Sequence, residues 1–172
     1  MRRIGVGLVL VMLSVLPAGT ASILPESLQG WERTTTSTLN YRIPGHEDTF
    51  RVPYINALGT KVKTDAKAGR TTWEYPKGTV IVKETYQGSG TPAQGAKPFR
   101  VYGMIKDPQH PKARGGWVWA TRETATGKET IHESPVCVDC HNYANSKHPY
   151  GDKNPQGEFR DYVYFPYGKR GQ

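Results

Sequence analysis

Five short runs of β-branched and aromatic residues, each cut off by turn residues, most constrain how this chain can fold. They are TFRVPYI (49–55), TTWEY (71–75), GTVIVKETY (78–86), FRVYGMI (99–105) and WVWATRE (117–123). Runs of this composition at close spacing are typical of strands in an antiparallel sheet. The sequence therefore predicts an α+β fold with one domain, in which a mainly antiparallel β-sheet is accompanied by a few short helices.

Four other segments carry weaker signals. They are LPESLQGWE (24–32), NALGTKVKTDAKAGR (56–70), SPVCVDCHNYANS (134–146) and FRDYVYFPY (159–167). We expect short helices in the first three and a strand in the last. The second helix would end at Gly69, and the third would open at Ser134 with Pro135 at its first helical position.

The first 21 residues have the composition of a secretory signal peptide. Two arginines give a positive start, residues 4–16 are apolar but too few to span a bilayer, and PAGTAS offers small residues to a signal peptidase. We expect cleavage near Ala21, with Ser22 as the alternative. An uncleaved anchor is the other interpretation of this segment.

Removal of residues 1–21 leaves about 150 residues, enough for one domain with a single core. We expect a polar N-terminal extension over 22–48, with a short helix, and a domain over 49–172. No second apolar segment of spanning length follows the signal. An exported protein without a membrane span is therefore predicted, located in the periplasm if the source is Gram-negative.

The charge of the chain argues against a nucleic-acid groove. The chain has 23 Lys and Arg residues against 15 Asp and Glu residues, a formal net charge of +8. These basic residues are isolated along the sequence and form no long block. The excess indicates either a solubilised surface or an acidic redox partner.

Both cysteines of the chain lie in one five-residue window, Cys137-Val-Asp-Cys140-His141. In an exported chain they could form a disulfide, whose catalytic version, the thioredoxin-like pair, expects a βαβ context. A structural zinc site would need two further ligands from scattered histidines. Haem attachment uses all three residues, because both thiols add to the porphyrin vinyl groups and the imidazole ligates the iron. We therefore predict one covalently bound haem c, with His141 as the iron ligand.

The class of haem protein depends on which group, if any, binds the iron on the side opposite His141. Electron-transfer cytochromes close this position with Met or His, whereas catalytic and gas-binding haems leave it open. Met104, in a predicted strand, is the only methionine outside the signal segment. The other histidines lie in loop-like sequence and are expected to be exposed to solvent. They are His46, His110, His132 and His148. An open, five-coordinate haem is therefore expected.

Lys83 is the unusual residue of the strand predicted over 78–86. Side chains alternate along a strand, so Lys83 shares a face with Ile81, and Glu84 shares the other face with Val82. Lys83 is either a gatekeeper on an edge strand or a lysine carried into the haem pocket. In the pocket, desolvation would lower its pKa and leave a nucleophilic amine near the porphyrin edge.

Four motifs, in their order along the chain, resemble the cytochrome P-460 family. They are FRVPYINALG (50–59), GTVIVKE (78–84), CVDCH (137–141) and DYVYFPY (161–167). The resemblance covers most of the chain after the signal segment. It implies that Lys83 is joined through its amine to a meso carbon of the haem and that Arg51 is a distal-pocket arginine. It also implies a mainly antiparallel sheet and a periplasmic homodimer.

The activity that the resemblance implies is the oxidation of hydroxylamine to nitrous oxide, with a further reaction with nitric oxide. The electrons would pass to a periplasmic redox partner cytochrome. In that chemistry a carboxylate of the pocket takes up protons, and Glu133, four residues before Cys137, is the candidate base. A surface glutamate is the other interpretation of Glu133. The predicted catalytic residues are thus Lys83, Arg51 and Glu133.

Two other functions stay open. Cytochrome c-prime-beta has the same fold without the lysine–haem bond, and it binds nitric oxide or carbon monoxide in an apolar pocket capped by aromatic residues. The candidate caps here are Phe50, Tyr54, Trp73 and Tyr102. A plain electron carrier would instead use Met104 or a histidine as the sixth ligand. Lys83 favours the hydroxylamine-oxidising branch.

Overall fold

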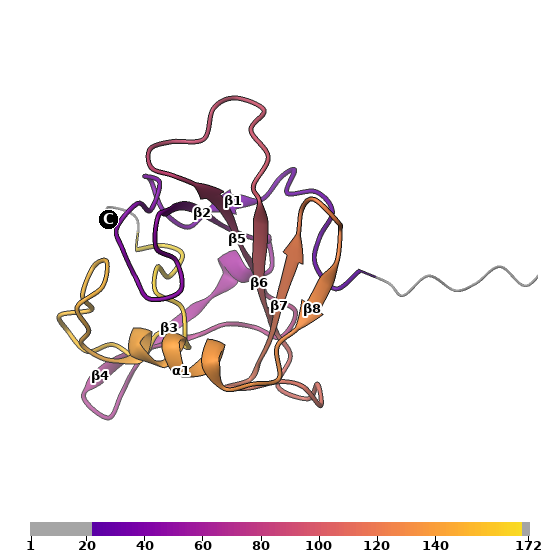
Figure 1. Cartoon of the computed structure of the whole chain (residues 1–172). Coiled ribbons are helices and arrows are strands. Elements are labelled where there is room, and N and C mark those ends of the chain that lie inside the picture. The colour runs from indigo at the N-terminus through magenta and orange to yellow at the C-terminus, as the bar shows by residue number, and fades with distance from the viewer. Residues whose placement is uncertain (1–21, 170–172) are drawn as a thin grey trace, which may run out of the picture.

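The computed structural model describes residues 22–169, so the predicted signal peptide lies outside the described residues. A six-stranded antiparallel sheet, in the order β1-β2-β5-β6-β7-β8, forms the body of the molecule, and β3 and β4 form a separate hairpin (Figure 1). The strands are β1 (Glu32–Arg33), β2 (Thr49–Ile55), β3 (Lys63–Lys67), β4 (Arg70–Glu74), β5 (Val80–Gln87), β6 (Arg100–Lys106), β7 (Trp117–Glu123) and β8 (Glu129–Ile131). The helical elements are α1 (Val136–Asn142) and the 3-10 helices η1 (Gly59–Lys61) and η2 (Tyr143–Asn145).

The predicted fold class is confirmed, because the structure is mainly antiparallel sheet with one short α-helix among the described residues. All five predicted strands are present, as β2, β4, β5, β6 and β7. The helix predicted around the two cysteines is present as α1, with Pro135 as its N-cap. The sequence does not predict β1, β3 or β8, because β1 and β8 are very short and β3 is exposed along its whole length.

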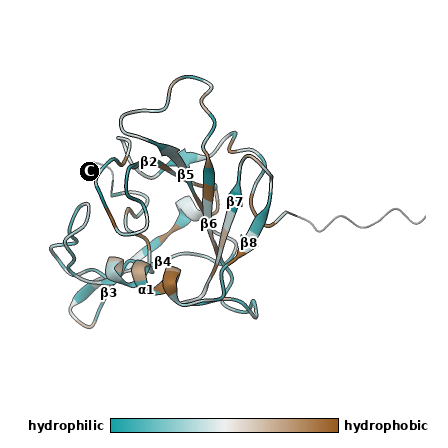
Figure 2. Cartoon of the chain, in the orientation of Figure 1, coloured by the Kyte–Doolittle hydropathy of each residue, from teal (hydrophilic) through white to brown (hydrophobic). Residues whose placement is uncertain are grey.

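The six-stranded sheet buries side chains on both faces, since each strand alternates its side chains between them. The inner-face cluster contains Ile55, Ile81, Met104, Trp117 and Trp119, with Cys137 and Val138 of α1 packed against it. The outer-face cluster contains Leu24, Val82, Val101 and Ala120. In Figure 2, hydrophobic residues accordingly follow β6 and the first turn of α1. The sheet therefore separates two different environments, one on each face.

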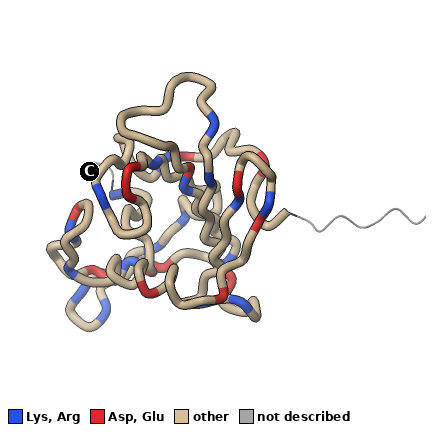
Figure 3. Tube along the Cα trace, viewed as in Figure 1, with Lys and Arg blue, Asp and Glu red and all other residues tan. Residues whose placement is uncertain are grey.

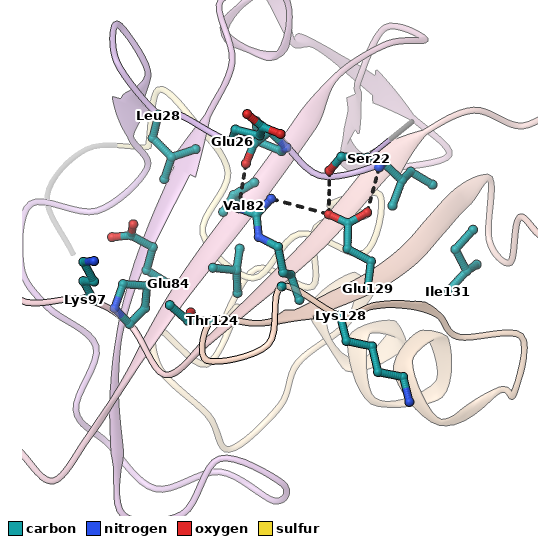
Figure 4. A pocket seen from close by; sticks show the side chains of 16 residues that line it. Ser22, Glu26, Leu28, Val82, Glu84, Lys97, Thr124, Lys128, Glu129 and Ile131 are labelled. Atoms are coloured by element: carbon teal, nitrogen blue, oxygen red, sulfur yellow. Dashed lines mark hydrogen bonds and ion pairs between the residues drawn. The ribbon is translucent and has the colours of Figure 1, made fainter. Parts of the chain in front are cut away.

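The N-terminal segment covers part of the outer face and does not form the helix predicted over 24–32. Leu24 is 2% exposed and packs over Gly103, where an added Cβ would lie 2.2 Å from a Leu24 methyl carbon. The carboxylate of Glu129 accepts hydrogen bonds from the backbone N–H groups of Ile23 and Leu24 and from the Ser22 hydroxyl, the last of which is drawn in Figure 4. These contacts tether the chain to the sheet, which explains why the helix prediction is wrong.

The helix predicted over 56–70 is also wrong. Asn56 accepts the N–H of Gly59 through its side-chain oxygen at 2.9 Å, and only the single turn η1 follows. The chain then enters the β3–β4 hairpin, whose turn residues Ala68 and Gly69 have φ of 50° and 78°. Two successive positive φ angles are what a tight two-residue hairpin turn requires.

The strand predicted over 159–167 is not formed either. Phe159 makes only an isolated parallel bridge to β4, and Asp161 and Tyr162 have φ of 50° and 68°, which no strand allows. Arg160, between Phe159 and Asp161, is fully buried. The aromatic run is therefore a series of ordered turns, and these turns carry part of the site described below.

Charged residues are spread over the described part of the chain. Figure 3 shows lysines and arginines along the whole trace, with acidic residues between them. Within residues 22–169 there is no helix of the length and apolarity that crossing a bilayer requires.

Candidate functional site

A cavity on the inner face of the sheet brings five of the predicted site residues together. Arg51 lines it from β2, Lys83 from β5, and Cys137, Cys140 and His141 from α1. Loop residues before β2 and the C-terminal turns complete the wall. The sheet places Arg51 and Lys83 on one face by the alternation of β2 and β5, so the cavity depends on the register between these strands.

Helix α1 presents both thiols to the cavity. Positions three apart lie on the same side of a helix, and Cys137 and Cys140 both line the cavity as free, half-buried thiols. Burial raises the pKa of the Cys137 thiol. Val136, just before them, is 72% exposed, so this end of the cavity lies next to solvent.

The imidazole of His141 is held in one tautomer. Its Nδ1–H donates to the backbone carbonyl of Tyr162 at 2.8 Å, which leaves Nε2 with a free electron pair. The rings of Trp119 and Tyr164 lie 4.7 and 5.4 Å from the imidazole, measured between centroids. Burial, with the charge of Lys83 adding to it, lowers the pKa of His141 to about 4. The ring is therefore neutral, as a metal ligand must be.

The C-terminal turns position the Tyr162 carbonyl that holds His141. The side-chain oxygen of Asn145 accepts the backbone N–H groups of Tyr162 at 2.9 Å and of Arg160 at 3.1 Å. The Tyr164 hydroxyl donates to the carbonyl of Cys140 at 2.8 Å and so joins the same turns to α1. The segment predicted as a strand thus supports the imidazole of His141.

Buried ion pairs fix these turns in place. The Arg160 guanidinium lies 2.5 Å from the carboxylate of Asp152 and 2.9 Å from that of Glu158. Lys106 Nζ lies 2.7 Å from the carboxylate of Asp161. The sequence predicts none of these three pairs, because their members lie in turns and in a strand without any local signal of pairing.

Lys83 lies in the cavity and not at a sheet edge. Because β5 pairs with β2 on one side and β6 on the other, the gatekeeper interpretation is wrong. The Nζ of Lys83 is 2.8 Å from His46 Nε2 and 4.8 Å from the ring centroid of Tyr102. Burial, together with the charge of Arg51, lowers the pKa of Lys83 to about 7. A substantial fraction of this amine is therefore uncharged at neutral pH.

Arg51 lines the cavity but its guanidinium is occupied by the protein. The side chain is 1% exposed and donates to the backbone carbonyls of Leu39, at 3.3 Å, and of Tyr41. Its Cζ also lies 4.9 Å from the ring centroid of Tyr41. In this structure Arg51 holds the loop before β2 against the cavity, and its role as a distal arginine stays a prediction.

Glu133 lies outside the cavity lining. Its carboxylate is 2.8 Å from Lys112 Nζ, and its side chain is 55% exposed. The hydrogen bond and charge of Lys112 lower the pKa of Glu133. No carboxylate from residues 22–169 lines the cavity, so a base in this pocket must be sought among other groups. The proposed role of Glu133 stays a prediction.

Two histidines line the cavity that the sequence places in exposed loops. They are His46 and His132. The exposure predicted for His148 is wrong, since this side chain is 7% exposed. No local signal marks His46, because the lysine that it contacts is 37 residues away in the sequence.

Among the four candidate aromatic caps, only Tyr102 lines the cavity. Phe50 lies on the outer face, where its ring stacks on Tyr86 at 5.2 Å, and Tyr54 packs against the same cluster. Met104 also lines the cavity from β6, where it packs in the inner-face cluster. The wall thus combines apolar side chains with a few polar groups.

The residues present fit a haem c. Two free thiols on one side of a helix, a neutral imidazole with Nε2 free and a largely apolar wall are the groups that such a cofactor needs. Within the described range, by contrast, no cluster of three or more His, Cys, Asp or Glu side chains is arranged to hold a metal ion directly. The geometry therefore gives no support to the zinc interpretation.

Comparison with known proteins identifies one match. A family model described as Cytochrome P460 matches residues 25–165, which include every strand and α1. A search of curated proteins finds none that matches the chain.

Proposed function

The chain belongs to the cytochrome P460 family, and from this membership we propose that it is an exported mono-haem c protein that oxidises hydroxylamine to nitrous oxide and also reacts with nitric oxide. The observation that carries the proposal is the amine of Lys83, which lies in the same cavity as Cys137, Cys140 and His141. A plain haem-binding pocket has no need of a lysine in a central strand.

When bound, the haem would supply an iron centre that can bind a small nitrogen compound and take up its electrons. Cys137 and Cys140 would hold it through thioether bonds, and His141 would ligate the iron through Nε2. The Tyr162 carbonyl keeps the imidazole in the required tautomer. The apolar wall keeps bulk water away from the reacting groups.

Lys83 would supply the amine that attacks an edge of the bound porphyrin. Nζ would form a C–N bond, losing one proton from the amine and one from the carbon, and two electrons would pass to a peroxide, which is reduced to water. The low pKa of Lys83 favours this step, because only the uncharged amine carries a free electron pair.

The redox partner, the periplasmic location and the homodimer are also proposed from family membership. The positive net charge suits an acidic redox partner such as a periplasmic cytochrome, which would receive the electrons. The exposed start of α1 lies next to the cavity and would give the electrons a route outward. A periplasmic location and a homodimer are tested by cell fractionation and by light scattering of the purified protein.

The decisive experiment is the intact mass and visible spectrum of protein matured in a host competent for cytochrome c assembly. We expect the mass of one haem and, in the reduced protein, a Soret band far to the red of ordinary haem c. Lys83→Ala should give an ordinary haem c spectrum and abolish hydroxylamine oxidation, while nitric oxide binding is retained. Colourless wild-type protein would refute the proposal.

Two other functions have an observation each in their favour. The largely apolar wall, with Tyr102 in it, suits a cytochrome c-prime-beta-like protein that binds nitric oxide or carbon monoxide. Met104 in the lining suits an electron carrier. An ordinary five-coordinate spectrum in the wild type would select the first, and a low-spin spectrum with a methionine-to-iron charge-transfer band the second.

A further inference from the structure

Oxidation of hydroxylamine releases protons, and the cavity needs a route by which they leave. The inference below rests on the proposed function. Since no carboxylate from residues 22–169 lines the cavity, the proton acceptors on its wall, apart from the iron ligand, are nitrogen bases. They are Lys83, His46 and His132.

His46 stands between the cavity and a second pocket that opens on the surface. Gly45, His46 and Tyr102 line both of them. The His46 ring meets the Tyr102 ring edge-on, with centroids 4.8 Å apart. Glu47 and Asp48, which directly follow His46, line only the surface pocket and supply carboxylates there. A proton that crosses the His46 ring therefore passes from an apolar cavity to an acidic, hydrated surface.

The two ring nitrogens of His46 have different surroundings. Nε2 lies 2.8 Å from Lys83 Nζ, on the cavity side. Nδ1 is buried and has no hydrogen-bond partner in the protein. A buried polar atom without a protein partner is normally satisfied by water or by a ligand. A water molecule that satisfies Nδ1 therefore has to enter from one of the two pockets that His46 lines.

The loop that carries His46 is held firmly. The backbone N–H of His46 donates to the Ile43 carbonyl at 3.1 Å, and its own carbonyl accepts the Thr49 hydroxyl at 2.8 Å. On the surface side, Arg100 donates to the Tyr102 hydroxyl at 3.2 Å. The ring of His46 is therefore fixed between Lys83 and Tyr102, and it does not swing freely into either pocket.

We propose that His46 passes protons from the Lys83 side of the cavity to the surface pocket. In each transfer, Nε2 takes up one proton while Nδ1 gives up another to water, so the ring ends neutral with its tautomer exchanged. The ring regains its first tautomer after turnover, when Nε2 gives its proton to water that exchanges with the bulk at the exposed Val136 end of the cavity and Nδ1 takes one from the surface pocket, so no proton returns to the reacting groups.

The charges around His46 agree with a transient carrier. Burial, with the positive charges of Lys83, Arg51 and Arg100 and the ring of His141 nearby, lowers the pKa of His46 to about 2. The imidazolium form of His46 is therefore disfavoured, which suits a ring that passes a proton on and does not hold it. His132 is less suited to carry protons outward, because its Nε2 is already hydrogen-bonded to the Thr121 hydroxyl at 3.0 Å. It also does not line the surface pocket.

The test compares His46→Phe, which keeps a ring against Tyr102 without nitrogens, with His110→Phe, a loop histidine that lines neither pocket. The first readout needs no substrate: the Soret band of oxidised holoprotein is followed after a rapid pH jump. His46→Phe should slow the resulting spectral change by about 10²-fold or more, and His110→Phe should not slow it. His46→Ala should be partly restored by imidazole in the buffer.

Hydroxylamine turnover and nitric oxide binding complete the test. Turnover should fall in His46→Phe in parallel with the pH-jump rate, while nitric oxide binding to the reduced protein, which transfers no proton, should keep its wild-type rate. An unchanged pH-jump rate in His46→Phe, or an equal loss in His132→Phe, would overturn the inference. If the wild type oxidises no hydroxylamine, the proposed function fails, and the pH-jump result still decides the role of His46.

Discussion

Replacing Asn145 with alanine should destabilise the protein by about 2–4 kcal/mol and loosen the support of His141. Asn145 is 6% exposed, and its side-chain oxygen accepts the backbone N–H groups of Arg160 and Tyr162 at 3.1 and 2.9 Å. Alanine leaves both donors unpaired. An unsatisfied buried donor costs about 1–3 kcal/mol, and the half-buried Tyr162 N–H belongs at the lower end of that range.

Asn142→Ala is the matched control. Asn142 is exposed, and its side-chain oxygen accepts a 3.3 Å hydrogen bond from the Asn145 amide. Its removal leaves the oxygen of Asn145 and both backbone donors in place. The unfolding free energy should therefore change by no more than about 0.5 kcal/mol.

Guanidinium unfolding of the holoprotein, followed by fluorescence, measures the difference in unfolding free energy between these variants. For a chain of this size, 1 kcal/mol corresponds to about 2–4 °C, so the melting temperature of Asn145→Ala should fall by at least about 4 °C. The reduction potential of the haem should also rise, because a weaker hydrogen bond from His141 to the Tyr162 carbonyl makes the ligand less basic. Wild-type stability in Asn145→Ala, or an equal loss in both variants, would refute the reasoning.

Three further predictions concern stability and processing. Leu24 is 2% exposed, so Leu24→Ala should lower the unfolding free energy by about 2–5 kcal/mol in urea titrations, and a negligible loss would show that the N-terminal segment is not docked. Burial raises the pKa of Asp152, but the hydrogen bond and charge of Arg160 outweigh it and hold the pKa below that of the unfolded chain. The resulting stabilisation is present at neutral pH and is lost progressively below about pH 5, so urea midpoints should fall with pH, less steeply in Asp152→Asn, and an unchanged slope in that variant would contradict the assignment. Mass spectrometry of the exported protein should place its first residue at Ser22, whereas a retained leader would support the anchor interpretation.

The parts of the molecule that sequence predicts are those whose signal is local. The strands β2, β5, β6 and β7 follow from runs of β-branched and aromatic residues, and the proposed haem-binding groups of α1 follow from their spacing of three and the adjacent histidine. The placement of Lys83 on the inner face with Ile81 follows from alternation alone. Whether that face is the cavity depends on the order of strands, which only the resemblance suggests.

The parts that sequence does not predict depend on contacts between distant residues. The aromatic run over 159–167 has the composition of a strand, yet the buried guanidinium of Arg160 and its two carboxylate partners hold it in turns. Its carbonyl at Tyr162 then orients His141, 21 residues away. Closeness in the sequence is an equally poor guide for Glu133. It lies four residues before Cys137, yet its carboxylate does not line the cavity.

Two lysines on the inner face of the sheet show how the fold distinguishes a structural cation from a reactive amine. Lys106 Nζ lies 2.7 Å from the Asp161 carboxylate, so this lysine forms a buried ion pair. Lys83, on the neighbouring strand, has the imidazole of His46 and the face of Tyr102 beside its nitrogen and forms no ion pair with a carboxylate of the described residues. A buried ammonium without a carboxylate is costly, and the cost is reduced when the amine gives up its proton. The absence of a carboxylate from the described cavity wall thus favours the uncharged form of Lys83 that the proposed nucleophilic role requires, and the same absence leaves His46 as the neighbouring group to which we assign proton transfer.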